Sequence, residues 1–273
     1  MPDSTLKIGL VGAHISRSRL ARALDLFCTA EGLTLDFRPR DSAEEDIDFE
    51  SLIRSLPAQG FDGFTVTHPF KTRAHDMATH RHMPPGIGSA NTLIFSGDAI
   101  HAHNTDHSGF TAAWSAAFAP SSPGTVLMAG AGGVSRAIAR GLLDLGADEV
   151  LIFDLDEAAA RIVAQDTGAT AIAVTDAPDA ASVATGLVNA TPMGMAEHPG
   201  MAFTVDMIGS QRWVFDAVYF PIETMFVATA RAAGIPVLTG FDLFRHMACQ
   251  SFATYTGRPA PDPAHLTPLA EGL

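Results

Sequence analysis

The sequence predicts an α/β fold divided into two domains. Short apolar stretches, each the length of a buried strand, alternate with longer stretches of helical periodicity, which is typical of sheets rich in parallel strands. A segment rich in Pro, Ser and Gly at residues 118–124 interrupts this alternation, and a new strand–turn–helix–strand unit begins behind it. The chain has 273 residues, 47% of them hydrophobic, which is enough apolar material for two packed cores.

The first domain is predicted from the elements before residue 108. Leu20, Leu24 and Phe27 repeat at helical spacing, whereas runs such as KIGLV suit a buried strand. In chain order we expect a strand at 7–11, a helix at 18–31, a strand at 33–37, a helix at 49–56 and a strand at 63–67.

The second domain is predicted from a similar alternation after the break. Its elements are a strand at 125–129, a glycine-rich turn, a helix that ends near Leu145 and a strand at 149–153. Helices after Gly240 are expected to pack back on the first domain. The predicted domains are therefore residues 1–108 with 241–273, and residues 109–240.

Composition and charge exclude several classes of function. The formal net charge of −13 disfavours nucleic acid as a partner, because an acidic surface repels phosphate groups. No apolar run is long enough to predict a membrane span, and the amino terminus lacks the layout of a signal peptide. Two cysteines, Cys28 and Cys249, suit a reducing compartment, so we expect a cytoplasmic protein. We expect it to be either a monomer or a homodimer.

The turn after the strand at 125–129 has the pattern of a dinucleotide site. Glycines let the backbone approach a pyrophosphate closely, and the helix that follows offers N–H donors and the positive end of its dipole. A tight turn that binds no ligand is the alternative. The pattern predicts a Rossmann-type NAD(P)-binding domain, whose cofactor-binding residues here are Gly130, Ala131, Gly132, Gly133 and Val134.

An acid at the end of the next strand predicts which dinucleotide binds. Asp154 lies 24 residues after Gly130, near the spacing at which a carboxylate accepts the ribose hydroxyls of NAD. The same carboxylate would repel the 2′-phosphate of NADP. We therefore expect NAD as the cofactor, with NADP as the second option. In the alternative interpretation, Asp154 merely caps the following helix.

Polar residues gather where strands of the first domain meet loops, in segments 67–71, 89–93 and 103–106. A lysine there can pass a proton to or from a hydroxyl–ketone pair while hydride moves, and a carboxylate can orient and tune the lysine. Taken singly, Lys71 is typical of a surface lysine and Asp106 of a helix cap. Their occurrence together, ahead of a dinucleotide domain, predicts a catalytic pair.

These segments make the chain similar to the shikimate dehydrogenase family, and within it to the NAD-using quinate/shikimate dehydrogenases. The similarity extends over nearly the whole chain and implies two α/β domains with the active site in the cleft between them. The matching segments are THPFK (67–71), SANTL (89–93), HNTDHSGF (103–110), GAGGVSR (130–136), FDLD (153–156), NATPMGM (189–195) and DAVYFPIET (216–224).

The resemblance also implies roles for individual residues. It makes Lys71 and Asp106 catalytic, and it places Thr67, Asn91 and Tyr219 in the substrate or nicotinamide pocket. The further cofactor-binding residues expected on this basis are Thr191, Pro192, Met193, Ala217 and Gly240.

The substrate-binding positions depart from the family pattern. The family has two hydroxyl-bearing residues after the first strand. An ungapped alignment gives the first position to Ser18 and the second to Leu20, whereas a gapped alignment uses Ser16 and Ser18. On the last long helix, Met247 stands at the position of a family glutamine, and Gln250 follows about one helical turn later.

The expected substrate is a small cyclic hydroxy acid or polyol: shikimate, oxidised to 3-dehydroshikimate, or quinate. Because Leu20 and Met247 remove hydrogen-bonding groups, and because Thr65 stands where the family usually has Asn, a related cyclohexane polyol is a competing substrate. A dinucleotide or metabolite sensor without turnover is the second class of function.

Two His-x-His motifs, at residues 80–82 and 101–103, raise the question of a metal site. No cysteine or carboxylate cluster accompanies them at ligand spacing. We therefore expect no metal.

Overall fold

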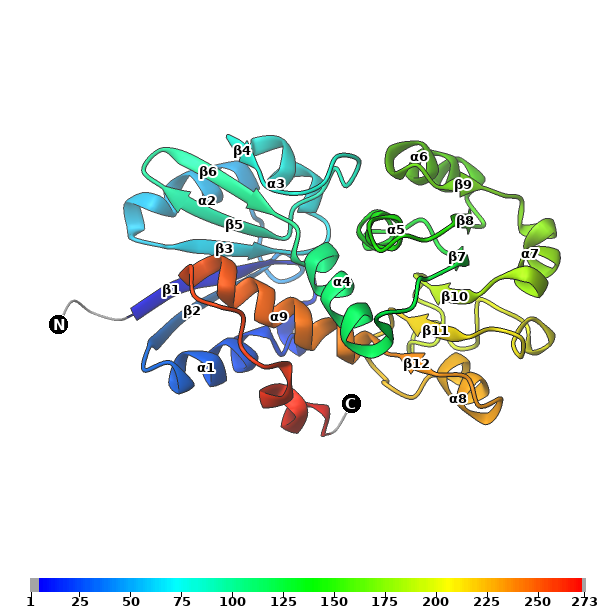
Figure 1. The fold of residues 1–273 in the computed structure, drawn as a ribbon. Helices are drawn as coiled ribbons and strands as arrows, with labels where there is room; N and C mark the ends of the chain where they lie inside the picture. The colour runs from blue at the N-terminus through cyan, green and yellow to red at the C-terminus, as the bar shows by residue number, and fades with distance from the viewer. Residues whose placement is uncertain (1–4, 272–273) are drawn as a thin grey trace. The chain divides into compact units, whose positions relative to one another are not determined.

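The computed structural model describes residues 5–271 and separates them into two compact units (Figure 1). The first unit comprises the chain up to Pro84, together with Gly88–Thr105 and Met247–Glu271. The second comprises Pro85–Ile87 and Asp106–His246. Each unit contains one six-stranded sheet, so the predicted α/β class is confirmed.

The sheet of the first unit is mixed rather than wholly parallel. Strand β1 pairs in parallel with β2 and β3, while β5 runs antiparallel to both β3 and β6. The order across the sheet is β2-β1-β3-β5-β6-β4, formed by β1 (Thr5–Gly12), β2 (Thr34–Asp41), β3 (Gly63–Val66), β4 (His80–Arg81), β5 (Thr92–Ser96) and β6 (Ala99–His103).

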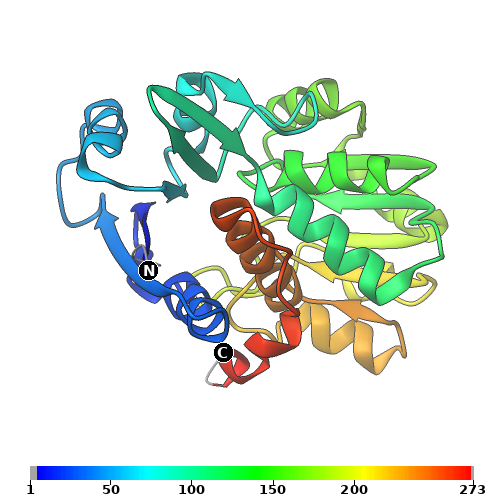
Figure 2. The same cartoon turned by 60° about the vertical axis from the view of Figure 1, so that its left-hand side comes forward.

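Helices cover both faces of this sheet. On one face lie α1 (Leu20–Ala30) and the part of α9 (Gly240–Thr256) that belongs to this unit, which Figures 1 and 2 both show side by side. The rings of Phe27 and Phe252 join them edge to face, with centroids 5.6 Å apart. On the other face, α2 (Phe49–Ser55) and α3 (Lys71–Met77) meet where the rings of Phe49 and Phe70 stack at 4.8 Å.

The first helix is shorter than the sequence predicts. A 3₁₀ turn, η1 (Ile15–Arg17), precedes it, and α1 begins only at Leu20. The Ser18 hydroxyl accepts a hydrogen bond from the Leu20 amide at 3.3 Å. Short polar side chains favour such local bonds at helix starts over a place inside the helix, which explains why the expected first turn is absent.

The sheet of the second unit is entirely parallel. Its order is β12-β11-β10-β7-β8-β9, formed by β7 (Thr125–Ala129), β8 (Glu149–Phe153), β9 (Thr170–Ala171), β10 (Gly186–Asn189), β11 (Trp213–Asp216) and β12 (Val237–Leu238). The order reverses between β7 and β10, and the glycine-rich turn follows β7. In doubly wound sheets, ligands bind at the carboxyl ends of strands beside such a reversal.

Alternate residues of β7 supply two separate cores. Val126 and Met128 pack with α4 (Thr105–Phe118), α5 (Ser135–Asp144) and α6 (Glu157–Thr167). Leu127 and Ala129 pack on the opposite face, where the covering helices are α7 (Ala177–Val183) and α8 (Met225–Ala232). The remaining 3₁₀ helices are η2 (Pro57–Gln59), η3 (Val174–Asp176), η4 (Val205–Met207) and η5 (Pro263–Ala270).

Both tryptophans lie in the first of these cores. Trp114 and Trp213 meet edge to face with ring centroids 6.0 Å apart. Within residues 5–271, no helix combines the length and the apolar character that crossing a membrane requires.

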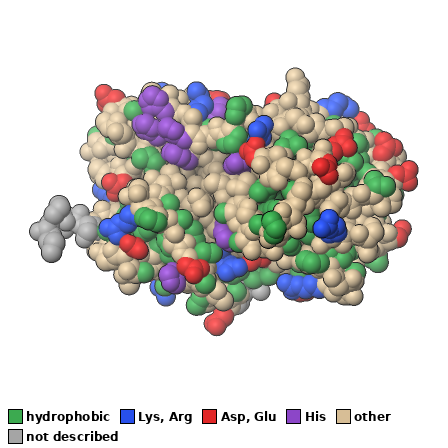
Figure 3. All heavy atoms as spheres, in the orientation of Figure 1, with side chains coloured by type: hydrophobic (Ala, Val, Ile, Leu, Met, Phe, Trp, Pro, Cys, Tyr) green, Lys and Arg blue, Asp and Glu red, His purple; other side chains and the backbone are tan. Residues whose placement is uncertain are grey.

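The two His-x-His motifs form one patch at the edge of the first sheet. Because β4 pairs with β6 in parallel, His80 lies opposite His101, and alternation places His82 and His103 on the same face. The centroids of contacting rings lie 4.7–5.2 Å apart, and Figure 3 shows a gathering of histidines there. Within residues 5–271, no group of three or more His, Cys, Asp or Glu side chains is arranged to hold a metal ion.

The patch predicts acid sensitivity. Burial, with the neighbouring His82 and His101, lowers the pKa of His103 from 6.5 to about 4. Between these two pH values the unfolded chain binds a proton that the folded chain does not, so stability present above pH 6.5 is lost as the pH falls towards 4. In thermal melts across this range, His103→Asn should lose less of its melting temperature than the wild type. His265→Asn, an exposed site, is the control, and parallel pH profiles of all three proteins would refute the assignment.

Candidate active site

The loop after β1 is held from two sides. On one side, the Asp41 carboxylate accepts hydrogen bonds from the backbone amides of His14 and Ile15, both at 2.9 Å. On the other side, the Ala13 amide donates to the His68 carbonyl at 2.8 Å. Amide donors, led by that of Ala43, keep the pKa of Asp41 below its usual range. This loop carries Ser16 and Ser18, and no sequence pattern pointed to Asp41.

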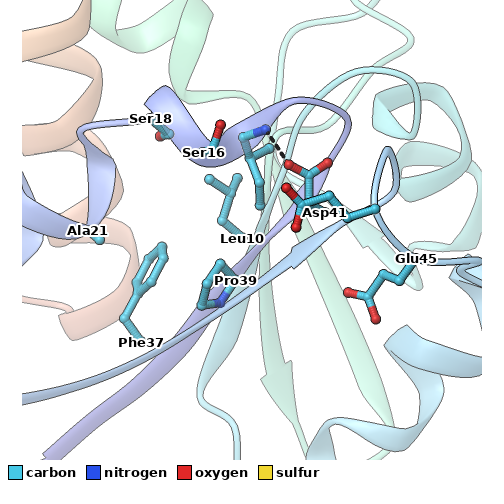
Figure 4. Close-up of a pocket in the computed structure, with 10 residues that line it drawn as sticks. Leu10, Ser16, Ser18, Ala21, Phe37, Pro39, Asp41 and Glu45 are labelled. Atoms are coloured by element: carbon cyan, nitrogen blue, oxygen red, sulfur yellow. Dashed lines mark hydrogen bonds between the residues drawn. The ribbon is translucent and has the colours of Figure 1, made fainter.

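A pocket of about 530 Å³ lies beside this loop (Figure 4). Ser16 and Ser18 line it, so the structure brings together the two hydroxyls that the gapped alignment selects. Leu20 does not line it and is only 3% exposed, because it packs inside the first unit at the start of α1. The other lining residues are Leu10, Ile15, Ala21, Phe37, Pro39, Asp41, Glu44 and Glu45.

Backbone hydrogen bonds join the three polar segments that the sequence singled out. The Lys71 carbonyl accepts from the Ala90 amide at 2.9 Å. Asn91 then bridges two strands, because its carbonyl accepts from the Val66 amide at 2.8 Å and its own amide donates to the His103 carbonyl at 3.1 Å. Segments distant in sequence therefore meet around Asn91.

The side chain of Asn91 is buried and fixed in one orientation. Its Oδ1 accepts from the Thr105 amide at 2.8 Å and from the hydroxyls of Thr105 and Thr92, both at 3.1 Å. Since all these partners donate, the oxygen must face them and the NH₂ group must face the other way. No acceptor among the described residues contacts that NH₂ group, which leaves it available to a substrate oxygen.

Thr105 leads directly into the predicted catalytic acid. Asp106 is the next residue and lies in the first turn of α4, and the boundary between the two compact units falls between them. The Thr105 hydroxyl also pairs with Ser251 of α9 at 2.9 Å. The backbone that carries Asp106 is thus anchored by Asn91 on one side and Ser251 on the other.

Thr65, which replaces a family asparagine, contacts another side chain of the same unit. Its hydroxyl lies 2.6 Å from the Tyr255 hydroxyl, which is buried and whose pKa is raised by that burial. On the same helix, the Ser251 hydroxyl donates to the Met247 sulfur at 3.5 Å, and Gln250 is only partly buried. Sequence reasoning missed Ser251 and Tyr255, because a hydroxyl on a helix carries no pattern of its own.

The glycine-rich turn has the form that a pyrophosphate needs. Gly130 has a φ of 104°, and a Cβ there would lie 2.8 Å from the Ala190 carbonyl group, so only glycine fits. At Gly132 and Gly133, by contrast, no described atom lies within 4 Å of a would-be Cβ. The protein's own packing does not require glycine at these two positions, whereas close approach of a pyrophosphate to the backbone would. The turn therefore suits a dinucleotide.

Asp154 contacts that turn directly. Its Oδ2 accepts from the Ala131 amide at 2.7 Å, and its Oδ1 accepts from the Asp156 amide at 2.8 Å. The alternative role as a helix cap is wrong for Asp154, because Asp156 caps α6 by accepting from the amides of Ala158 and Ala159. The carboxylate of Asp154 is therefore held against the glycine-rich turn.

The loop with Thr191, Pro192 and Met193 is held by a side chain that the sequence analysis did not single out. Asn189, the last residue of β10, accepts from the Thr191 hydroxyl at 2.6 Å and donates to the Met193 carbonyl at 2.9 Å. Its amide group also donates to Asp216 at the end of β11. Both residues belong to the matching motifs, but spacing alone gives no sign that they meet.

The remaining predicted positions surround the end of β11. The Ala217 amide donates to the Asn189 carbonyl at 2.8 Å. A Cβ at Gly240 would lie 2.3 Å from the Val218 carbonyl oxygen, so α9 can begin there only with glycine. Tyr219 is partly buried, and its ring packs on Phe244 with centroids 5.0 Å apart.

Comparison with curated proteins finds relatives along nearly the whole chain. A quinate/shikimate dehydrogenase (NAD(+)) from Corynebacterium efficiens is 34% identical over 269 residues, which cover 94% of this chain and 95% of the relative. A shikimate dehydrogenase (NADP(+)) from Arthrobacter sp. (strain FB24) is 34% identical over 266 residues, 93% of this chain and 90% of the relative. A scan against protein-family models found no match.

Solved structures agree with these relatives. The quinate dehydrogenase from Corynebacterium glutamicum in complex with NAD matches with a TM-score of 0.88 and 30% identity, over 96% of this chain and 97% of that one. The shikimate 5-dehydrogenase from Thermus thermophilus in complex with NADP(H) and shikimate matches with a TM-score of 0.83 and 27% identity, over 97% and 98%. The resemblance inferred from the motifs is confirmed: the chain belongs to the shikimate/quinate dehydrogenase family of NAD(P)-dependent oxidoreductases.

Proposed function

We propose that this chain is an NAD-dependent dehydrogenase that interconverts a secondary alcohol and a ketone on a small cyclic hydroxy acid. Shikimate and 3-dehydroshikimate are the best candidate pair, with quinate as a further substrate. The observation that carries the proposal is 34% identity, along almost the full length of both chains, to a relative named as using NAD on quinate and shikimate. The Asp154 carboxylate beside the glycine-rich turn supports the same cofactor.

Each residue proposed for the reaction has a separate role. Lys71, at the start of α3, takes the proton of the substrate hydroxyl as the alcohol is oxidised and returns it in the reverse direction. Asp106 orients the lysine for this proton transfer. The free NH₂ group of Asn91 and the hydroxyl of Thr67 hold substrate oxygens, and Ser16 and Ser18 hold the carboxylate.

The glycine-rich turn and its neighbours are proposed to bind the cofactor, whose nicotinamide ring, when bound, accepts or gives the hydride. Backbone amides at the start of α5 hold the pyrophosphate. Asp154 accepts the ribose hydroxyls and repels a 2′-phosphate. Two unit charges about 4 Å apart interact by roughly 4 kcal/mol at an effective dielectric constant of ~20, an upper limit at a site open to water.

The same proposal includes the domain boundaries, the oligomeric state and the cellular location. Residues 1–108 with 241–273 form the substrate-binding and catalytic domain, and residues 109–240 form the NAD(P)-binding domain. We propose a monomer or a homodimer that acts in the cytoplasm, in line with the burial of both Cys28 and Cys249.

A related polyol without the full set of shikimate groups is the second candidate substrate. It is favoured by Met247, whose sulfur accepts from Ser251 where a family glutamine would offer an amide. A pocket without such a group discriminates against substrates that need it.

The catalytic assignment predicts the effect of Lys71→Ala. Loss of a positioned proton-transfer group should lower kcat by about 10²–10⁴-fold. The dissociation constant for NAD should stay nearly unchanged, since the glycine-rich turn lies in the other compact unit. Lys7→Ala is the matched control, because Lys7 is the only other lysine and its ammonium group lies over the Phe61 ring at 4.7 Å. A kcat of Lys71→Ala within threefold of the wild type would exclude this role.

The cofactor assignment predicts that kcat/KM is higher with NAD than with NADP and that Asp154→Asn narrows the ratio. Asparagine keeps one oxygen for the backbone amides but removes the charge that opposes the 2′-phosphate. Asp156→Asn, two residues further on, is the control, because it alters the cap of α6 and should leave the ratio unchanged. If wild-type kcat/KM is higher with NADP, Asp154 does not select the cofactor.

The departures from the family pattern at the substrate-binding positions predict a high KM for shikimate. Met247→Gln should lower this KM. One restored hydrogen bond contributes about 1–3 kcal/mol, which corresponds to roughly 5- to 140-fold in KM. Adding Leu20→Ser tests the ungapped alignment. Because Leu20 is buried and does not line the pocket, we expect no further fall in KM, and the melting temperature is measured alongside. In the rival arrangement Gln250 already supplies the amide. In that case neither Met247→Gln nor the double variant lowers the KM for shikimate, and Gln250→Ala alone raises it severely.

A further inference from the structure

A buried carboxylate bonds to two segments that carry expected cofactor-binding and pocket residues. Asp216 is fully buried at the end of β11 and accepts three hydrogen bonds. Its Oδ1 accepts from Asn189 Nδ2 at 2.9 Å and from the Val218 amide at 3.0 Å, and its Oδ2 accepts from the Thr224 hydroxyl at 2.5 Å. Among the described residues, no Lys, Arg or His forms an ion pair with it.

Each of the three donors belongs to a different segment. Asn189 closes the loop that holds Thr191 and Met193. Val218 lies between Ala217 and Tyr219, which are two of the expected pocket positions. Thr224 caps α8 by accepting from the Val227 amide at 3.2 Å. One side chain therefore sets the relative positions of two ligand-facing segments and a helix end.

The surrounding donors explain why a carboxylate occupies this position. Every neighbouring group donates, and only a carboxylate can accept on both oxygens at once. Burial disfavours its charged form and raises the pKa of Asp216. An asparagine would turn its NH₂ group towards one of the donors and lose at least one of the three bonds. An apolar side chain here would leave all three donors unpaired.

We propose that Asp216 is a positioning residue, which fixes the loop from Asn189 to Met193 and the Ala217–Tyr219 segment so that they can receive the nicotinamide ring. This inference rests on the proposed dehydrogenase function and adds to it a group that touches neither cofactor nor substrate. The Asp154 carboxylate bonds instead to the Ala131 and Asp156 amides, so the adenosine end of the cofactor should not depend on Asp216.

Paired ligands separate this role from a general loss of stability. ADP-ribose carries the adenosine and pyrophosphate groups of NAD but lacks nicotinamide. In calorimetric titrations, Asp216→Asn should weaken NAD about tenfold, equivalent to ~1.4 kcal/mol, and leave the affinity for ADP-ribose within about twofold. The turnover number should fall as well, since a displaced ring is badly placed for hydride transfer.

Two further variants keep the test independent of the folding of Asp216→Asn. Thr224→Val removes the hydroxyl at nearly constant volume and should reproduce the selective loss of NAD affinity. Thr224→Ser keeps the hydroxyl and should keep the NAD affinity of the wild type. Thr229→Val is the matched control on the same helix, because the Thr229 hydroxyl bonds to its own helix and to the Met201 sulfur rather than to Asp216.

The outcomes are distinct. A selective loss of NAD affinity in Asp216→Asn and Thr224→Val supports the positioning role. Equal losses for NAD and ADP-ribose, or no loss for either, overturn it. If the wild type binds neither NAD nor ADP-ribose, the proposed dehydrogenase function itself fails. Failure of that function is therefore distinguishable from failure of the positioning role of Asp216.

Discussion

Much of the candidate site depends on a single buried amide. Asn91 sits at the start of β5, where its backbone bridges β3 and the end of β6, and its side-chain oxygen holds both the amide and the hydroxyl of Thr105. An unpaired buried polar group costs about 1–3 kcal/mol, so these bonds allow one arrangement of the segments and penalise the others. They anchor the backbone immediately before Asp106, in the same unit that carries Lys71.

The second compact unit uses a similar device with a charge instead of an amide. Asp216 gathers donors from three segments at the carboxyl edge of a parallel sheet, on the strand next to β10, where the strand order reverses. In both units, groups proposed to touch ligands lie on loops or at helix starts, and a buried polar side chain fixes the geometry of the backbone that carries them. Loops positioned in this way can bind precisely without being part of a regular element.

The sequence was informative where a pattern is local. Strand-length apolar runs and helical periodicity predicted most elements, and the glycine-rich turn and Asp154 were recognised by their spacing. The mixed pairing of β3, β5 and β6 was not predicted, because antiparallel pairing of short strands depends on long-range contacts. The hydrogen-bond networks of Asn91, Ser251, Tyr255 and Asp216 were not predicted for the same reason, because their partners lie far away in sequence. Leu20 shows the converse case, since alignment assigned it to a substrate position and the structure buries it.

The proposed chemistry requires Lys71 and Asp106 to act on a substrate hydroxyl while hydride moves to NAD. A crystal structure of the chain soaked with NAD and shikimate tests this most directly. We predict that the Lys71 ammonium nitrogen lies within hydrogen-bonding distance, about 2.6–3.2 Å, of the hydroxyl whose carbon faces the nicotinamide ring, and that the Asp106 carboxylate contacts the same hydroxyl or the lysine. A structure in which both ligands bind but that hydroxyl contacts neither residue would contradict it.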